Sequence, residues 1–78
     1  MSQKLPRVTA DKMIRVVEKL GFSLVRQSGS HKIYKNESGK RITISYHPGK
    51  VLHPKVIKSI LKDADISVEK FKELLKKV

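Results

Sequence analysis

The hydrophobic pattern of the chain begins with a helical repeat near the amino terminus. Apolar residues return every three or four positions, at Ala10, Met13, Ile14, Val17 and Leu20. Charged residues fill most positions between them, so the spacing predicts an amphipathic helix. Thr9 suits the N-cap and Gly21 the carboxyl end. Residues 1–8 are predicted to form an extended lead-in.

Loose alternation of apolar and polar residues replaces this repeat from Phe22 onward. It predicts three strands, over residues 22–27, 30–36 and 41–46. The connection at Ser28-Gly29 is long enough only for a tight hairpin, and residues 36–39 form a turn cluster that ends in Gly39. The three strands are therefore expected to form an antiparallel meander.

Helical spacing returns after the third strand and continues to the end of the chain. Pro54 suits the first turn of a helix whose apolar stripe is Ile57, Ile60, Leu61 and Ala64. Ser67 is the expected N-cap of a last short helix, with Val68, Phe71, Leu74 and Leu75 facing inward. The prediction is an α+β fold of order αβββαα, a single domain over residues 1–78 with the helices on one face of the sheet.

Charge narrows the class of partner. Eighteen Lys and Arg residues against seven Asp and Glu give a net charge of +11 and, between positions 26 and 58, eight cations face one anion. Such an excess favours a polyanion, with nucleic acid ahead of a membrane surface. The alternative is that the charge serves only solubility. The chain has no cysteine, no apolar run long enough to span a membrane and no visible signal peptide, so a cytoplasmic protein is expected.

The triplet Gly29-Ser30-His31 is the main candidate for chemistry. Imidazole titrates near neutral pH, and in a basic groove it can move a proton while its neighbours hold a phosphate. These are the requirements of a small metal-free ribonuclease; the alternative is a structural or surface histidine. The three histidines lie 16 and 6 positions apart and have no nearby carboxylate ligand, so no metal site or cofactor is expected.

The assembled motifs resemble the HicA (YcfA-like) toxins of prokaryotic toxin–antitoxin pairs. The resemblance covers nearly the whole chain and is carried by Leu20-Gly21-Phe22, Leu24-Val25-Arg26-Gln27, Gly29-Ser30-His31, Ile33-Tyr34, His47, Gly49-Lys50, Leu52, Ile60-Leu61, Ala64, Ile66-Ser67, Glu69 and Phe71. The chain departs from the family pattern at Ser45, often Pro, at Pro48, often Gly, at Lys55-Val56, often Gly-Thr, and at Asp65, often Gly.

The resemblance implies a fold like the double-stranded RNA-binding domain, and mRNA cleavage in which His31 is essential. It also implies a HicB-like antitoxin that covers the site. As general base, His31 would take the proton of a ribose 2′-OH. His47 is the candidate assistant, the alternative being a hydrogen bond that fixes its loop, while His53 is expected to cap the second long helix. The residues expected to contact RNA are Arg26, Gly29, Ser30, Lys32, Lys35, Lys40 and Lys50.

Two questions stay open at this stage. Alternation puts His31 on the face of Ile33, which we expect to be the core face, and His47 on the face opposite Ile44. A bulge near Gly29, or a position of His31 beyond the helix ends, would free the imidazole. Tyr34 and Tyr46 are expected to pack rather than stack on bases.

The rival function is a non-catalytic RNA-binding module on the same fold. A DNA-binding regulator ranks lower because no helix-turn-helix pattern is present.

Overall fold

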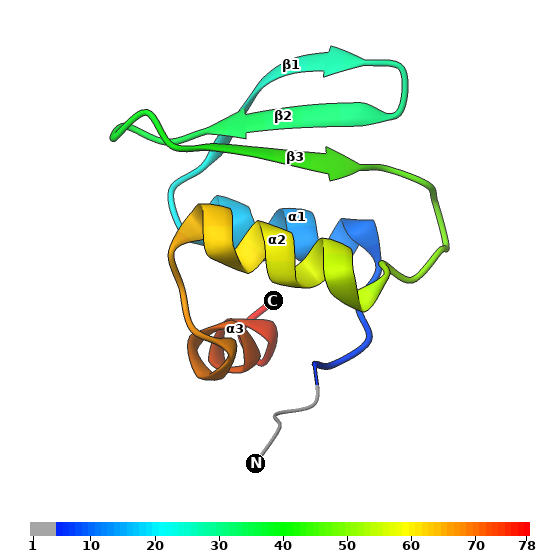
Figure 1. Ribbon diagram of the computed structural model, residues 1–78, viewed down its shortest axis with the longest axis vertical. Helices are drawn as coiled ribbons and strands as arrows, with labels where there is room; N and C mark the ends of the chain where they lie inside the picture. The colour runs from blue at the N-terminus through cyan, green and yellow to red at the C-terminus, as the bar shows by residue number, and fades with distance from the viewer. Residues whose placement is uncertain (1–4) are drawn as a thin grey trace.

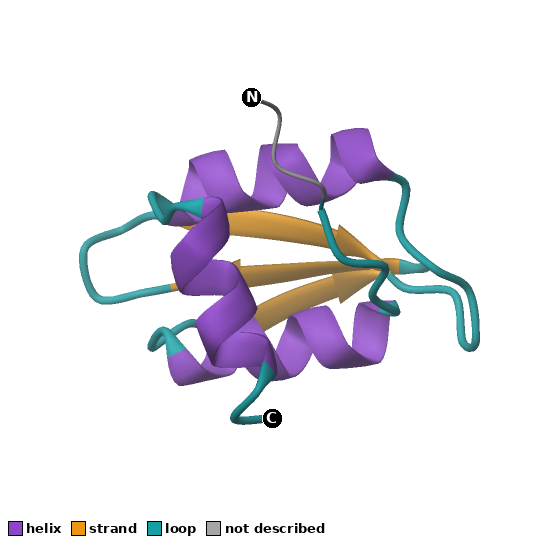
Figure 2. Cartoon of the chain, turned by 90° about the horizontal axis from the view of Figure 1, so that it is seen from below, coloured by secondary structure: helices purple, strands orange, loops and turns teal. Residues whose placement is uncertain are grey.

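The computed structural model describes residues 5–78 and has the predicted order of elements (Figure 1). They are α1 (Ala10–Lys19), β1 (Ser23–Ser28), β2 (His31–Lys35), β3 (Arg41–Ser45), α2 (Pro54–Ala64) and α3 (Val68–Leu75). Figure 2 shows α1 and α2 side by side against one face of the sheet, and α3 crossing them on the side away from the strands. The predicted α+β fold, with its helices on one face of a three-stranded antiparallel sheet, is confirmed.

All three helices begin at the predicted caps. The side chains of Thr9, His53 and Ser67 accept hydrogen bonds from backbone N–H groups in the first turns of α1, α2 and α3. His53 does so through Nδ1, which lies 3.0 Å from the backbone nitrogen of Lys55. These bonds satisfy donors that a helix leaves free at its amino end. The prediction that His53 caps α2 is therefore confirmed.

The strands form the predicted meander in the order β1-β2-β3, with slightly shifted bounds. The hairpin turn is Gly29-Ser30 rather than Ser28-Gly29, since Ser28 already pairs with His31. Gly29 has φ +58° and Ser30 a negative φ, the combination that a type II′ turn requires at its two central residues. The predicted hairpin is correct, and its register lies one residue later than expected.

The expectation that Ile33 faces the core is wrong. Tyr34, which is only 2% exposed, packs on the helices together with Ile42, its partner on β3. Ile33 pairs with Thr43 and points to the opposite side of the sheet. Two adjacent residues of β2 are both apolar enough to be buried, and the register with β3 selects Tyr34. Burial, with the Glu18 carboxylate as a smaller influence, raises the pKa of Tyr34.

A bulge lies in β1 between Leu24 and Arg26, and not near Gly29, which was one of the two alternatives considered. Leu24 pairs with Tyr34 and Arg26 with Ile33, so Val25 is an extra residue. One extra residue exchanges the faces of everything beyond it. The bulge therefore moves Arg26 away from the helices and onto the same side as Ile33.

The predicted lead-in falls partly outside the described residues, which begin at Leu5. Val8 is buried, and its carbonyl accepts a hydrogen bond from the N–H of Leu52 at 2.8 Å. Next to it, Thr9 and Val51 form an isolated antiparallel bridge. These contacts fix the segment between β3 and α2 against the start of α1. No helix within residues 5–78 is long and apolar enough to cross a membrane.

Candidate active site on the open face of the sheet

One face of the sheet carries no helix (Figure 1). We call it the open face. From the strand register, its residues are Ser23, Arg26, Ser28, His31, Ile33, Lys35, Arg41, Thr43 and Ser45. None of these side chains is acidic, and three are permanently cationic. The open face is therefore a positively charged surface with His31 at one end.

His31 is held in place by the hairpin that precedes it. The turn at Gly29-Ser30 ends directly at His31, the first residue of β2. On the other side, the carbonyl of Ser30 accepts a hydrogen bond from the N–H of Tyr46 at 2.7 Å. His31 thus lies on backbone that is bonded to both neighbouring strands, and its side chain is exposed. No bulge at Gly29 is needed to bring the imidazole to solvent.

Two serine hydroxyls flank the imidazole. Ser28 and Ser45 are the cross-strand partners of His31 on β1 and β3. The bond between Ser30 and Tyr46 makes the next pair, His31 and Ser45, one without mutual hydrogen bonds, in which side chains approach most closely. Such partners have Cβ atoms about 4.5–5.5 Å apart. A hydroxyl at that position can accept a hydrogen bond from an imidazole N–H and orient the ring.

Three cations lie on the open face at two distances from His31. Arg26 is diagonal to His31 on β1, about 7–8 Å away by its position in the ladder. Lys35 and its partner Arg41 lie four residues further along the strands, about 13 Å at ~3.3 Å per residue. One cation therefore lies beside the histidine, and a pair lies further along a path that an extended polyanion can follow.

His47 and Lys50 are brought together by a turn beyond the end of β3. The N–H of Lys50 donates to the carbonyl of His47 at 3.1 Å, and between them Gly49 has φ +76°. Pro48 followed by a glycine with positive φ matches a type II turn. The loop is thus closed by the backbone of His47, and its imidazole is exposed. Ser45, the partner of His31, lies two residues before it.

Lys32, predicted to contact RNA, lies on the helix side of the sheet. Its Nζ is 4.2 Å from the centroid of the Tyr46 ring. The Tyr46 hydroxyl donates a hydrogen bond to the Asp11 carboxylate, and this bond is the main reason that the pKa of Tyr46 is raised. Tyr46 is half-buried, in keeping with the packing role expected for it. Lys32 is thus part of a contact between β2, β3 and α1, and the structure does not bring it to the side of His31.

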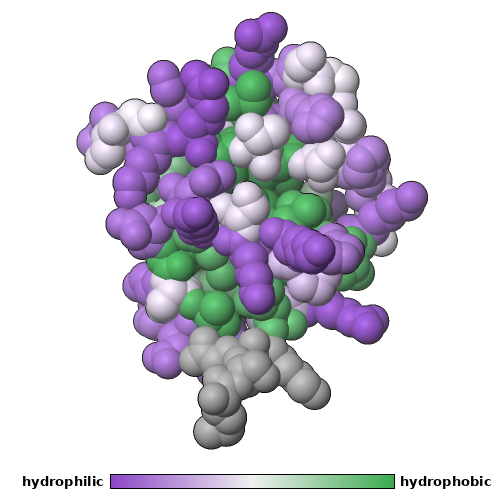
Figure 3. All heavy atoms as spheres, viewed as in Figure 1, coloured by the Kyte–Doolittle hydropathy of each residue, from purple (hydrophilic) through white to green (hydrophobic). Residues whose placement is uncertain are grey.

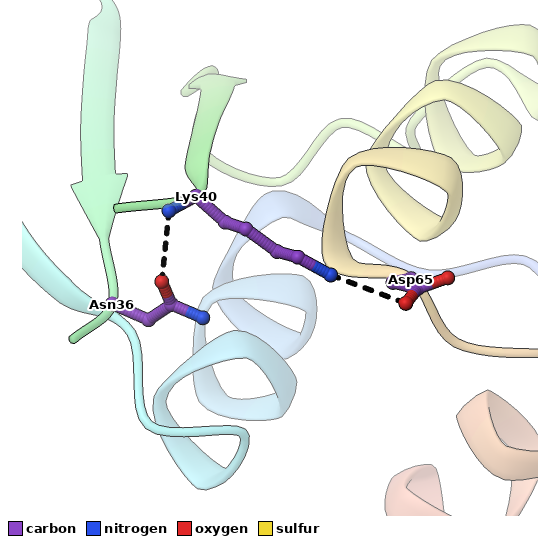
Figure 4. Close-up of polar contacts among 3 residues, drawn as sticks. All are labelled: Asn36, Lys40 and Asp65. Atoms are coloured by element: carbon purple, nitrogen blue, oxygen red, sulfur yellow. Dashed lines mark hydrogen bonds and ion pairs between the residues drawn. The ribbon is translucent and has the colours of Figure 1, made fainter. Parts of the chain in front are cut away.

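Lys40 is also directed away from the open face (Figure 4). Its backbone N–H donates to Asn36 Oδ1 at 2.9 Å, which closes the turn between β2 and β3. Its Nζ lies 3.2 Å from Asp65 Oδ2, at the carboxyl end of α2. This ion pair joins the turn to the helix layer, so Lys40 is not among the cations beside His31.

Among the open-face residues that sequence reasoning did not assign to the site, three matter most: Ser28 and Ser45, the cross-strand partners of His31, and Arg41, a cation. Their positions follow from the register rather than from any motif. Residues 36–40 connect β2 to β3 and set the pairing of Lys35 with Arg41, which in turn places Ser45 opposite His31. A correct turn assignment for residues 36–40 would have predicted Arg41 and Ser45, and a turn at Gly29-Ser30 would have predicted Ser28. Within residues 5–78 the structure contains no group of three His, Cys, Asp or Glu side chains able to hold a metal ion.

Comparison with models of protein families identifies the family of the chain. The family model described as the HicA toxin of bacterial toxin–antitoxin systems matches residues 10–66, from the first residue of α1 to just beyond α2. The chain belongs to the HicA toxin family. The match covers the whole sheet and both helices that pack on it, and leaves α3 outside. No curated protein matches this HicA family member.

Proposed function

We propose that this HicA family member is an endoribonuclease that cleaves mRNA on the open face, with His31 as general base. The observation that carries the proposal is the position of His31. It is an exposed imidazole at a fixed point of the sheet, between two serine hydroxyls and beside an arginine. The family contributes the biological setting, a toxin with an antitoxin partner. A HicB-like antitoxin that covers the open face is the partner we propose.

In this mechanism His31 removes the proton of a ribose 2′-OH. The resulting oxygen attacks the adjacent phosphorus in line, and the bond from phosphorus to the 5′-oxygen of the next nucleotide breaks. The products are a 2′,3′-cyclic phosphate and a 5′-hydroxyl. Arg26 is placed to stabilise charge on the phosphoryl oxygens, while Lys35 and Arg41 hold a phosphate further along the strand.

His47 is the proposed general acid, which gives a proton to the departing 5′-oxygen. If the ladder between β2 and β3 is continued by two residues beyond Ser45, His47 lies diagonal to His31, about 7–8 Å away. A phosphodiester group can lie between two imidazoles at that separation. Lys50, held close to His47 by the turn, is placed to contact the same phosphate.

The test uses RNA with one 2′-deoxynucleotide at a mapped cleavage site, in the presence of a metal chelator. Cleavage is expected to stop at that site and continue elsewhere, and products from unmodified RNA are expected to carry a cyclic phosphate. Cutting that continues next to the deoxyribose would disprove the mechanism.

The alternative is an RNA-binding module without catalysis. The same basic open face supports it, and both functions predict salt-dependent binding to RNA. A module that only binds RNA does not cleave it, so His31→Ala has no cleavage activity to abolish. RNA that stays intact with the wild-type protein, while binding it, would select this alternative.

A further inference from the structure

A small hollow lies next to the candidate active site, between the end of β3 and the start of α2. Its apolar lining consists of Val51, Leu52 and Val56. Two imidazoles, those of His47 and His53, complete the wall. In Figure 3 apolar side chains show between the strands and α2, with hydrophilic side chains around them. The mechanism proposed above uses His47 and Lys50 but gives no role to the apolar lining or to His53.

The hollow adjoins His31 through a single residue. Ser45 lines the hollow and is the cross-strand partner of His31. In a pair of this kind the two Cα atoms are about 4.5 Å apart. A nucleotide whose phosphate lies at His31 therefore has its sugar and base within reach of the hollow. Lys50 lines the hollow as well, and supplies a positive charge there.

The backbone at the start of α2 offers no hydrogen-bond donor to a phosphate. Pro54 has no N–H, and the N–H of Lys55 already donates to His53 Nδ1. The N–H groups of Val56 and Ile57 both donate to the carbonyl of His53, at 2.9 and 3.1 Å. The first turn therefore has no free donor for an anion, unlike the helix ends that bind phosphates. Apart from Ser45 and Lys50, the lining of the hollow is carbon surface and imidazole ring, which suit a flat, apolar ligand.

The size of the hollow limits the ligand further. Its volume is about 170 Å³, whereas sites for drug-sized molecules and cofactors run from ~300 to ~1,000 Å³. A base that is paired in a duplex keeps its faces against its neighbours and cannot enter. An unpaired base can be turned out of a single strand and stacked on a ring such as that of histidine.

We propose that this hollow binds one unpaired nucleobase next to the phosphodiester that lies at His31, so that the bound RNA is single-stranded there. The inference rests on the proposed function only in taking RNA as the ligand. His53 has a second task here. Since its Nδ1 accepts the N–H of Lys55, its neutral ring carries the proton on Nε2, a donor for an acceptor atom on a base edge.

The experiment measures affinity for a single-stranded oligonucleotide with 2′-O-methyl riboses, which blocks the attacking hydroxyl. One abasic position is moved along the strand. For the wild-type chain, loss of one particular base is expected to weaken binding about fivefold or more, as loss of a stacked base does elsewhere. Equal affinity for every abasic strand would overturn the inference.

Two variants at Val51 separate base binding from general electrostatics. Val51 is 53% exposed, so Val51→Asp and Val51→Lys place a charge in the hollow without disturbing the core. Both variants are expected to bind intact and abasic strands with equal affinity. If RNA is held near Val51 only by electrostatic attraction, Val51→Lys should instead bind RNA more tightly and keep the difference in affinity between intact and abasic strands. That result would contradict base binding in the hollow.

The matched controls are Val25→Asp and Val25→Lys. Val25 is a valine of similar exposure, 56%, and it lies in β1 away from the hollow. In these variants, removal of the critical base is expected to weaken RNA binding as much as it does in the wild type. If all abasic strands bind as tightly as the intact strand, and RNA cleavage still requires His31, only this inference is overturned. Affinity that depends on one base, in a protein that cleaves no RNA, would support this inference and overturn only the proposed function.

Discussion

The salt dependence of RNA binding is a quantitative test of the open face. Arg26, Lys35 and Arg41 are the strand cations on that face, and all three are exposed. Replacing each by glutamine removes three positive charges, and exposed substitutions of this kind change stability little. If each side chain binds one phosphate, the triple variant loses three contacts and the counterions released with them.

The expected magnitude follows from the number of contacts. On single strands each neutralised phosphate contributes about 0.7 to the slope of log affinity against log salt. The triple variant should therefore have a slope smaller by about 2. Between about 50 and about 200 mM salt each contact weakens binding about 2.6-fold, so three contacts account for a loss of about 18-fold. Over this range of salt, the affinity of the wild type is therefore expected to fall about 18-fold more than the affinity of the triple variant.

The assay is fluorescence anisotropy with a labelled 2′-O-methyl oligonucleotide at several salt concentrations. The control carries Lys62→Gln, Lys70→Gln and Lys72→Gln, the same change of charge on α2 and α3. Its slope is expected to stay near that of the wild type. If the slope of log affinity against log salt falls equally in both triple variants, RNA binding depends on net charge alone. The assignment of phosphates to the open face is then refuted.

Three smaller predictions concern the framework of the site. Gly29→Ala should lower the free energy of unfolding by about 1–2 kcal/mol in urea denaturation, because φ +58° is costly for a residue with a Cβ; an unchanged midpoint would contradict the turn. Asp65→Gly should raise it by up to about 1 kcal/mol, since relief of the left-handed conformation (φ 59°) outweighs the loss of an exposed ion pair with Lys40; a clear loss would mean that the ion pair matters more. The pKa of Tyr46 is raised in the folded state, so the unfolded chain loses that proton first, and stability should fall as the pH rises above 10.0. Tyr46→Phe should reduce this fall, and an identical alkaline profile would argue against the hydrogen bond to Asp11.

The helices could be predicted from the sequence because each one carries its signals locally. Thr9, His53 and Ser67 act within one turn of the residues they cap, and the apolar spacing needs no distant partner. The order of the strands was predictable for the same reason. Both connections in the meander are short, so each strand pairs with its neighbour in sequence.

The composition of the two sheet faces could not be predicted from local pattern. Ile33 and Tyr34 are adjacent and both suit a core, so alternation alone does not choose between them. Pairing with Ile42 decides for Tyr34, and the extra residue Val25 then brings Arg26 to the side of His31. Both facts depend on register between strands, which a one-residue shift reverses. The candidate site was therefore predictable in its histidine and only in part in its neighbours.

The central claim is that His31 performs the chemistry, and single-turnover cleavage of labelled RNA tests it most directly. His31→Ala is expected to lower the cleavage rate by about 10²–10⁴-fold, as loss of a positioned acid or base does. Its affinity for the uncleavable 2′-O-methyl strand should stay within about twofold of the wild type, because the role proposed for His31 is proton transfer and not phosphate binding. A His31→Ala variant that cleaves RNA at close to the wild-type rate would contradict the account.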